Sequence, residues 1–253
     1  MEETYRIKAI TLNRQAFREN DLSVILYGAE RGKQTLVARG AKKFRSKLAA
    51  HLEPICLCEV MAVSGKQYDY IGSIISTNCF VQIKNNLDRV QAAVQGMNVF
   101  NKLIKYEQKD HLIFDLLLDF LNILNKVDLK IDPQFLTAIF KLKLIDLLGF
   151  KPELFNCMIC GKKLKPGGSR FDLRKNGFIC HECQSIKGIE FQNFRNQLQV
   201  SGKSNFLTAS DDCIKVLRLV IENDFSILEK LNIKISLKQE ILYFIDNFFN
   251  YSQ

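Results

Sequence analysis

Four of the eight cysteines fall in a pattern suited to metal binding. In the segment NCMICGKKLKPGGSRFDLRKNGFICHEC, Cys157 and Cys160 form one Cys-x-x-Cys pair, and Cys180 and Cys183 form a second. Nineteen residues separate the inner cysteines. Four thiolates complete a tetrahedral zinc site and leave no coordination position open for water or substrate. The pattern therefore predicts one structural Zn²⁺ ion. A redox dithiol or unrelated buried cysteines are the alternatives, but a redox pair needs only one Cys-x-x-Cys.

The other four cysteines, Cys56, Cys58, Cys79 and Cys213, lie in apolar sequence without a partner at ligand spacing. We interpret them as buried free thiols.

The start of the chain, MEETYRIKAITLNRQ, lacks the basic-then-apolar order of a signal peptide, and the sequence contains no long apolar run without charges. We therefore expect a cytoplasmic protein whose cysteines are reduced or bind metal.

A second group of residues suited to binding is a basic segment without any acidic residue. Its seven cations are Arg31, Lys33, Arg39, Lys42, Lys43, Arg45 and Lys47. The whole chain carries a formal net charge of +9. Lysine and arginine side chains neutralise phosphates and release condensed counterions regardless of base sequence. We therefore interpret this segment as a polyanion-binding surface in preference to a solvated loop.

Phe44 lies among these charges and allows two interpretations. Its ring can stack on a nucleic-acid base, because stacking combined with backbone charge suits single strands. Alternatively it can turn into the core, and this second interpretation is slightly preferred from the sequence.

The sequence shows no recognisable catalytic arrangement. The three histidines, His51, His111 and His181, form no His-Glu-x-x-His site. No Walker phosphate loop, nucleophile elbow or dinucleotide fingerprint occurs. We therefore expect a protein that is not an enzyme, although carboxylates distant in sequence can still assemble a site.

Hydrophobic periodicity indicates an α+β protein. From Tyr5 to about Ser76, five short runs rich in β-branched and aromatic residues predict a small antiparallel barrel or sandwich. A barrel is favoured because closure removes exposed sheet edges, and it can be of the oligonucleotide/oligosaccharide-binding (OB) type or SH3-like. From about Asn86 the period becomes helical. Asp132 is predicted to cap one helix, and Ser210 and Ser236 are predicted to cap two later ones. We expect domains at 1–80 and 81–253, with the cysteine segment inserted at about 154–187.

Taken in order, LVARGAKKFRSKLAAHLEPICLCEV, the helical middle and the cysteine pairs after LIDLLGFKPEL resemble the RecO family of bacterial DNA repair and recombination mediators. The resemblance covers most of the chain. It implies an N-terminal OB-fold, a helical domain and a zinc-binding insertion that many members have. It also matches Arg39, Lys42, Lys43 and Arg45 to the family's DNA-binding region, and the four cysteines to its metal site.

The same resemblance implies a function at the bacterial nucleoid. Proteins similar to this one bind single- and double-stranded DNA and anneal complementary strands. They act with RecR, recognise the acidic C-terminal tail of single-strand DNA-binding protein, and help RecA displace that protein. No membrane partner is implied.

Two other functions remain open from the residues alone. One is a zinc-dependent nucleic-acid enzyme with an unrecognised carboxylate site. The other is a non-enzymatic scaffold whose basic surface binds acidic protein tails.

Overall fold

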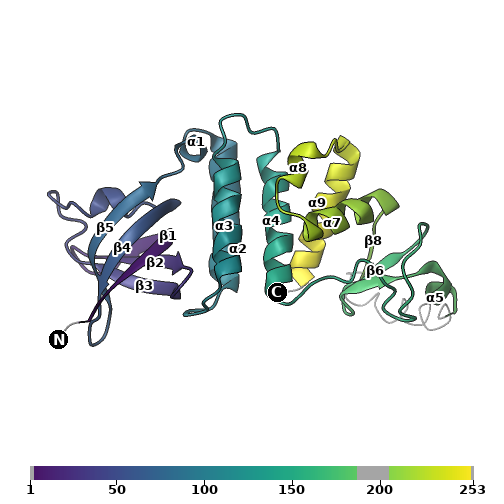
Figure 1. Ribbon diagram of the computed structural model, residues 1–253, viewed down its shortest axis with the longest axis horizontal. Helices are drawn as coiled ribbons and strands as arrows, with labels where there is room; N and C mark the ends of the chain where they lie inside the picture. Colours follow the sequence, from purple (N-terminus) through teal and green to yellow (C-terminus); the bar gives the residue numbers. More distant parts are fainter. Residues whose placement is uncertain (1–2, 187–204, 252–253) are drawn as a thin grey trace. The chain divides into compact units, whose positions relative to one another are not determined.

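The computed structural model describes residues 3–186 and 205–251 of the chain. The chain forms two compact units, Met1–Phe140 and Lys141–Gln253. The first unit holds a β-barrel followed by helices, and the second holds a small sheet and further helices (Figure 1). This mixture confirms the predicted α+β class. Within the described ranges, no helix has the length and hydrophobicity needed to cross a lipid bilayer.

Five strands close into a barrel in the first unit. They are β1 (Thr4–Ala16), β2 (Leu22–Gly28), β3 (Gly32–Ala38), β4 (Cys56–Val63) and β5 (Tyr70–Asn78). Their order is β1-β2-β3-β5-β4, and the barrel closes through a parallel contact of Val37 in β3 with Tyr70 in β5. The other pairings are antiparallel. This order is that of an OB-fold, so it decides between the two barrels that the sequence allows.

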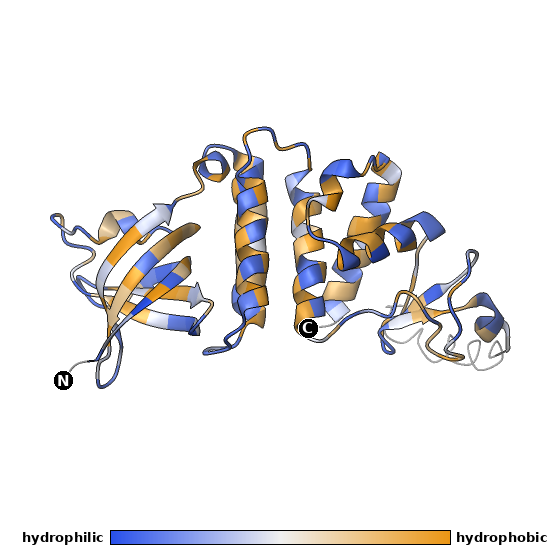
Figure 2. Cartoon of the chain, viewed as in Figure 1, coloured by the Kyte–Doolittle hydropathy of each residue, from blue (hydrophilic) through white to orange (hydrophobic). Residues whose placement is uncertain are grey.

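Side chains alternate between the barrel core and the surface. In β1, Tyr5, Ile7 and Ala9 are buried while the residues between them are exposed, because successive side chains of a strand point to opposite faces. Figure 2 shows hydrophobic and hydrophilic residues interspersed along the strands and helices, as elements with one buried face require. The connection between β3 and β4 contains only a short 3₁₀ helix, Ala49–His51, and is otherwise irregular.

Helices pack beside the barrel within the first unit. They are α1 (Val81–Lys84), α2 (Leu87–Leu103), α3 (His111–Leu124) and the first part of α4 (Pro133–Leu147). Asp132 accepts hydrogen bonds from the backbone of Gln134 and Phe135, which confirms the predicted cap of α4. The Phe120 and Phe140 rings stack with centroids 4.4 Å apart.

The second unit combines a three-stranded sheet with helices. After α4 come β6 (Arg170–Asp172), β7 (Gly177–Ile179), α5 (His181–Ile186), β8 (Phe206–Thr208), α7 (Asp211–Glu222), α8 (Ile227–Lys230) and α9 (Ile235–Tyr251). Strand β6 is central and pairs antiparallel with β7 and β8. The four cysteines therefore lie in chain order between α4 and α7. The predicted domain boundary at residue 80 and the predicted bounds of the cysteine-bearing insertion, about 154–187, stay predictions. Residue 187 lies outside the described residues.

Candidate metal site and nucleic-acid interface

The first cysteine pair lies in a tight turn between α4 and β6. The Gly161 N–H donates to the Cys157 carbonyl oxygen at 2.9 Å, and Gly161 has φ +68°, a conformation that glycine adopts readily. The N–H groups of Ile159 and Cys180 donate to Cys157 Sγ, each at 3.4 Å. Cys160, the second member of the pair, is exposed. One N–H group of this turn and one of the second pair are thus directed at the Cys157 sulfur.

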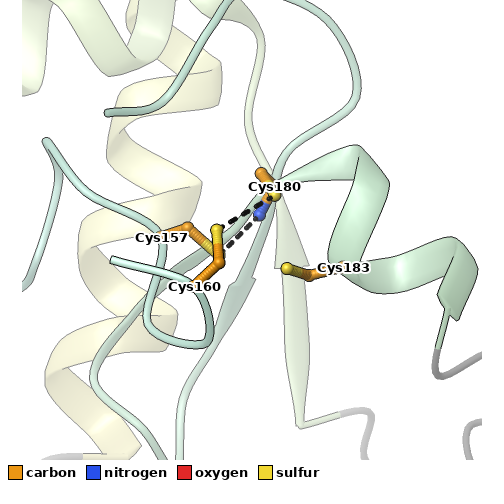
Figure 3. Close-up of side chains that lie close together, drawn as sticks. All are labelled: Cys157, Cys160, Cys180 and Cys183. Atoms are coloured by element: carbon orange, nitrogen blue, oxygen red, sulfur yellow. Dashed lines mark hydrogen bonds between the residues drawn. The ribbon is translucent and has the colours of Figure 1, made fainter. Parts of the chain in front are cut away.

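The second pair joins the first through the end of β7. Cys180 directly follows β7, and Cys183 lies in the first turn of α5. The four sulfur atoms all lie within 4.8 Å of one another (Figure 3). With Zn–S bonds of about 2.3 Å, the sulfurs of a tetrahedral site are about 3.8 Å apart. The cluster can therefore hold a metal ion after a small contraction, and its four thiolate donors suit zinc.

Backbone dipoles and crowding shift the pKa values of Cys157 and Cys183 in opposite directions. Burial raises the pKa of Cys157, but backbone N–H groups of Cys180, Cys160 and Ile159 outweigh it and lower that pKa to about 6. Burial and the neighbouring thiols of Cys180, Cys160 and Cys157 raise the pKa of Cys183 to about 12. Four adjacent thiolates repel one another. A divalent cation would remove this repulsion, because a coordinating thiol is deprotonated.

A cluster of phenylalanines supports the cysteine-bearing sheet. The Phe171 ring in β6 lies edge-to-face with Phe178 in β7 and with Phe244 in α9, at centroid distances of 5.1 and 5.0 Å. Phe248, one turn further along α9, completes the cluster at 5.7 Å from Phe171. All four side chains are fully buried. The sheet is thereby fixed to the C-terminal helix by apolar contacts that do not involve the metal site.

Helix α7 also contacts the cysteine segment at two points. The Arg218 guanidinium donates to the Leu154 carbonyl oxygen at 2.8 and 2.5 Å and lies 5.1 Å from the centre of the Phe155 ring. The Asp211 carboxylate accepts a hydrogen bond from Gly167 N–H at 3.1 Å. These contacts hold the segment just before the first cysteine pair and in the middle of the loop between the pairs.

The predicted DNA-binding cations divide into three groups. Five lie on the connection between β3 and β4 and are exposed: Arg39, Lys42, Lys43, Arg45 and Lys47. We call residues 39–47 the basic loop. Arg31 lies in the turn between β2 and β3 and is half-buried. Lys33 forms the third group, because it lies in strand β3 and is buried.

The basic loop meets the connection between β1 and β2. The Lys42 N–H donates to the Asn20 carbonyl oxygen at 3.0 Å, and the Gly40 N–H donates to the Asp21 carboxylate at 2.8 Å. That connection in turn contacts the loop between β4 and β5, where the Phe17 and Tyr68 rings lie edge-to-face at 5.2 Å. OB-folds bind oligonucleotides with the β1–β2 and β4–β5 loops. The basic loop therefore lies beside the surface that this fold uses for binding.

Two arginines stack on tyrosines near the β3–β5 closure. The Arg39 guanidinium lies 3.5 Å from the centre of the Tyr70 ring, and the Arg31 guanidinium lies 3.8 Å from that of Tyr5. The Tyr5 hydroxyl donates to the Asp69 carboxylate at 2.6 Å. Burial and this hydrogen bond raise the pKa of Tyr5 to about 12. Arg31 is thus linked to Arg39 through Tyr5, Asp69 and the adjacent Tyr70. These contacts restrict the positions of both arginine side chains.

Sequence reasoning missed the aromatic residues of this surface. Phe17 lies in the β1–β2 connection, Tyr68 lies in the β4–β5 loop, and Tyr70 is the first residue of β5. In the sequence, Tyr68 and Tyr70 fall in a run that predicts only a strand. Their place at the binding loops of an OB-fold follows from the strand order.

The preference for placing Phe44 in the core was wrong. The Phe44 side chain is fully exposed, at 103% of the reference area. It lies in a short irregular segment flanked by lysine and arginine, so no strand or helix directs it inward. An exposed ring among cations is available for stacking on a base.

Lys33 has a structural position that does not fit the predicted role in DNA contact. Its side chain is only 6% exposed, and Nζ donates to the carbonyl oxygens of Asn101 at 2.5 Å and Ile104 at 3.1 Å. These carbonyls lie at the C-terminal end of α2, where helix carbonyls lack intrahelical partners and attract cations. Lys33 therefore ties the barrel to α2 inside the first unit.

Three of the four remaining cysteines are buried as predicted, namely Cys56, Cys58 and Cys213. Cys79 is only half-buried, which corrects the prediction for that residue. It directly follows β5 and packs against the barrel core while remaining partly exposed.

An OB barrel with an exposed basic loop, joined in one chain to helices that carry a four-cysteine cluster able to hold a metal ion, defines the class of protein as an OB-fold protein with a helical second part. Comparison with protein families identifies the family. The family model for the N-terminal part of recombination protein O matches residues 1–80, and the model for its C-terminal part matches residues 84–192.

Individual relatives extend this match along nearly the whole chain. The DNA repair protein RecO of Desulforamulus reducens is 24% identical over 98% of this chain and 89% of its own length. The RecO proteins of Symbiobacterium thermophilum and Rubrobacter xylanophilus are 30% and 32% identical, over 71% and 72% of both chains respectively. The chain belongs to the RecO family, and its role is in DNA repair and recombination.

Proposed function

We propose that this protein is a recombination mediator that binds single- and double-stranded DNA through one end of its OB barrel and anneals complementary strands. The observation that carries the proposal is the basic loop, which bears five exposed cations and is hydrogen-bonded to the β1–β2 connection, where the Phe17 ring contacts Tyr68 of the β4–β5 loop. We call the basic loop together with Phe17–Asp21 and Ser64–Tyr70 the loop surface. Its cations suit phosphates, and its rings suit unpaired bases.

Annealing by this surface requires no covalent chemistry. Two DNA strands repel each other through their phosphates, and exposed cations such as Lys42 and Lys43 screen that repulsion. Phe44 and the other rings hold bases only while these are unpaired. Pairing removes the stacking contacts, so the finished duplex is held by charge alone and is released more easily. The protein would act without catalytic residues.

We propose zinc as the metal, with one ion held by Cys157, Cys160, Cys180 and Cys183. Four thiolate ligands favour zinc and fill its tetrahedral shell, so the ion would hold the fold together and would not activate a water molecule. A zinc-dependent nuclease would need an open coordination position, which this set of ligands does not provide.

Family membership supports the proposed partners. These are RecR, the acidic C-terminal tail of single-strand DNA-binding protein, and RecA, which the protein would help to load onto coated single strands in the bacterial cytoplasm. The basic surface is compatible with an acidic tail on electrostatic grounds. We also propose the OB domain at 1–80 and the helical domain at 81–253, with the zinc-binding insertion at about 154–187.

An annealing assay tests the proposed activity. Complementary labelled strands are mixed without nucleotide, and the rate of duplex formation is compared for the native protein and the Lys42→Glu/Lys43→Glu variant. We expect the variant to anneal at least about tenfold more slowly while its melting temperature is unchanged, because both side chains are exposed.

The matched control is Lys105→Glu/Lys109→Glu. It makes the same change in net charge at two exposed lysines between α2 and α3 of the same unit. We expect annealing by this control to change less than about twofold, since the effect should depend on position and not on total charge. Equal annealing by both variants, or normal annealing by Lys42→Glu/Lys43→Glu, would remove the basic loop from the mechanism.

A further inference from the structure

Two cysteines outside the four-cysteine cluster lie in direct contact at one end of the barrel. The Cys56 thiol donates to Cys79 Sγ, with the sulfur atoms 2.9 Å apart. In the β4–β5 ladder, Leu57 is opposite Asn78, so Cys56 and Cys79 are the next residues beyond that pair. Directly opposed residues of antiparallel strands have Cα atoms about 4.5–5.5 Å apart, which is within the range that a disulfide spans.

A cation lies at this pair. Lys84, the last residue of α1, donates from Nζ to Cys56 Sγ at 3.3 Å. Lys84 is exposed. Cys79 is half-buried and therefore partly accessible to solvent, whereas Cys56 is buried. A solvent-accessible sulfur near a lysine, with a second thiol in contact, is the arrangement of a reactive cysteine and its resolving cysteine.

The two thiols differ in acidity. Burial raises the pKa of the Cys79 thiol, but hydrogen bonds from Cys56 and Ser76 and the positive charge of Lys84 together outweigh it and lower this pKa. Burial and the contact with Cys79 raise the pKa of Cys56 to about 12. Cys79 is therefore the more acidic thiol of the pair, and Cys56 is the thiol that donates in their contact.

We propose that Cys79 is a site of oxidation by hydroperoxides and that Cys56 resolves the product into an intramolecular disulfide. The Cys79 thiolate attacks one peroxide oxygen, so an S–O bond forms and the O–O bond breaks. The sulfur is oxidised to a sulfenic acid, and the departing alkoxide or hydroxide takes a proton from water. The Cys56 thiolate then displaces hydroxide from the Cys79 sulfur, and an S–S bond forms.

Lys84 assists the second step as well as the first. Once Cys79 becomes a neutral sulfenic acid, the ammonium is no longer shared with a neighbouring thiolate. Its contact with Cys56 then favours deprotonation of that thiol, which must attack as the thiolate. The disulfide would tie the start of β4, where the connection carrying the basic loop ends, to the end of β5.

Peptide mapping of the whole, zinc-loaded protein tests the proposal. The protein is treated with equimolar hydrogen peroxide, digested without reducing agent and analysed by mass spectrometry, with dimedone present in a parallel sample to trap sulfenic acid. We expect a Cys56–Cys79 linked peptide in the native protein. In Cys56→Ser we expect no link and a dimedone adduct at Cys79, because the resolving thiol is missing.

Two comparisons make the test specific. Lys84→Gln should slow the modification of Cys79 roughly threefold to tenfold, whereas Lys66→Gln, at an exposed lysine of the β4–β5 loop, should leave the rate unchanged. Cys213 is the reference thiol, since burial raises its pKa to about 12. A Cys79 rate equal to that of Cys213, or oxidation confined to the four metal-site cysteines, would overturn the proposal.

Discussion

The cysteine cluster and the basic loop use their side chains in opposite ways. In the cluster, four sulfur atoms converge to within 4.8 Å of one another, with buried phenylalanines supporting the sheet beside them. In the basic loop, five cations and Phe44 are exposed to solvent. Converging side chains stabilise a local structure, whereas exposed side chains remain available to a ligand. Changes in the first region should therefore affect stability, and changes in the second should affect DNA binding.

The largest effect should follow loss of the proposed metal ligands. Replacing Cys157→Ala and Cys160→Ala removes two of the four proposed ligands, so the variant should no longer bind the proposed zinc ion and should lose the folding free energy that depends on it. We expect the metal content, measured by mass spectrometry, to fall to near zero, and the second unit to become sensitive to protease. Any soluble protein should still bind DNA, because the loop surface lies in the first unit.

Cys213→Ala is the control for this change, as it removes a buried cysteine outside the cluster. It should keep its metal. If the Cys157→Ala/Cys160→Ala variant stayed fully stable yet failed to bind DNA, the cysteine cluster would serve DNA binding and not stability.

A smaller but still large effect should follow Phe171→Ala. Phe171 is completely buried and contacts Phe178, Phe244 and Phe248, so its truncation leaves a cavity. We expect a loss of about 3–5 kcal/mol in the free energy of unfolding of the second unit, measured by denaturant titration. Phe150→Ala, at an exposed ring, should cost much less. Equal costs would mean that the phenylalanine cluster does not support the sheet.

Lys33 allows structural and DNA-binding roles to be compared within the basic segment itself, because it is the buried cation of that segment. In Lys33→Met the carbonyl oxygens of Asn101 and Ile104 lose a charged donor, so we expect a cost of about 1–3 kcal/mol in stability. The salt dependence of DNA binding should be unchanged, since the lysine does not reach solvent. Lys8→Met, at an exposed position in β1, is the control and should change stability by less than about 0.5 kcal/mol. A reduced salt dependence of DNA binding in Lys33→Met would show that Lys33 contacts DNA phosphates.

The smallest effect should be that of Phe44→Ala. Because the ring is exposed, its loss should leave the melting temperature unchanged. We expect binding to single strands to weaken by about 1 kcal/mol, the low end for one stacked base, with binding to duplex DNA unaffected. Fluorescence anisotropy with single- and double-stranded oligonucleotides measures both. Equal weakening for both forms of DNA would argue against stacking.

The sequence predicts much of the local structure because periodicity and caps are local signals. Four thiols at metal-binding spacing, the strands of the barrel and the caps at Asp132 and Ser210 all agree with the structure. The prediction of a cap at Ser236 was wrong, because α9 begins one residue earlier and the Lys234 carbonyl accepts from Lys238 N–H.

Features that depend on distant contacts were not predictable in the same way. The closure of β3 on β5 rests on a single parallel pair, and β8 joins β6 from far along the chain. The buried position of Lys33 depends on the carbonyls at the end of α2, which no local pattern around Lys33 indicates. Likewise, Phe44 gave no signal for its exposure, because apolar character alone does not place a loop residue inside or outside.

The central claim is that the basic loop binds DNA phosphates, and a salt titration of binding tests it most directly. The affinity for a labelled single-stranded oligonucleotide is measured by fluorescence anisotropy over a range of salt concentrations, for the native protein and for Lys42→Glu/Lys43→Glu. We predict that log affinity falls linearly with log salt and that the variant has a slope shallower by about 1.4 or more, since each lost phosphate contact removes about 0.7. Identical slopes for the two proteins, or no binding by the native protein at low salt, would contradict the account.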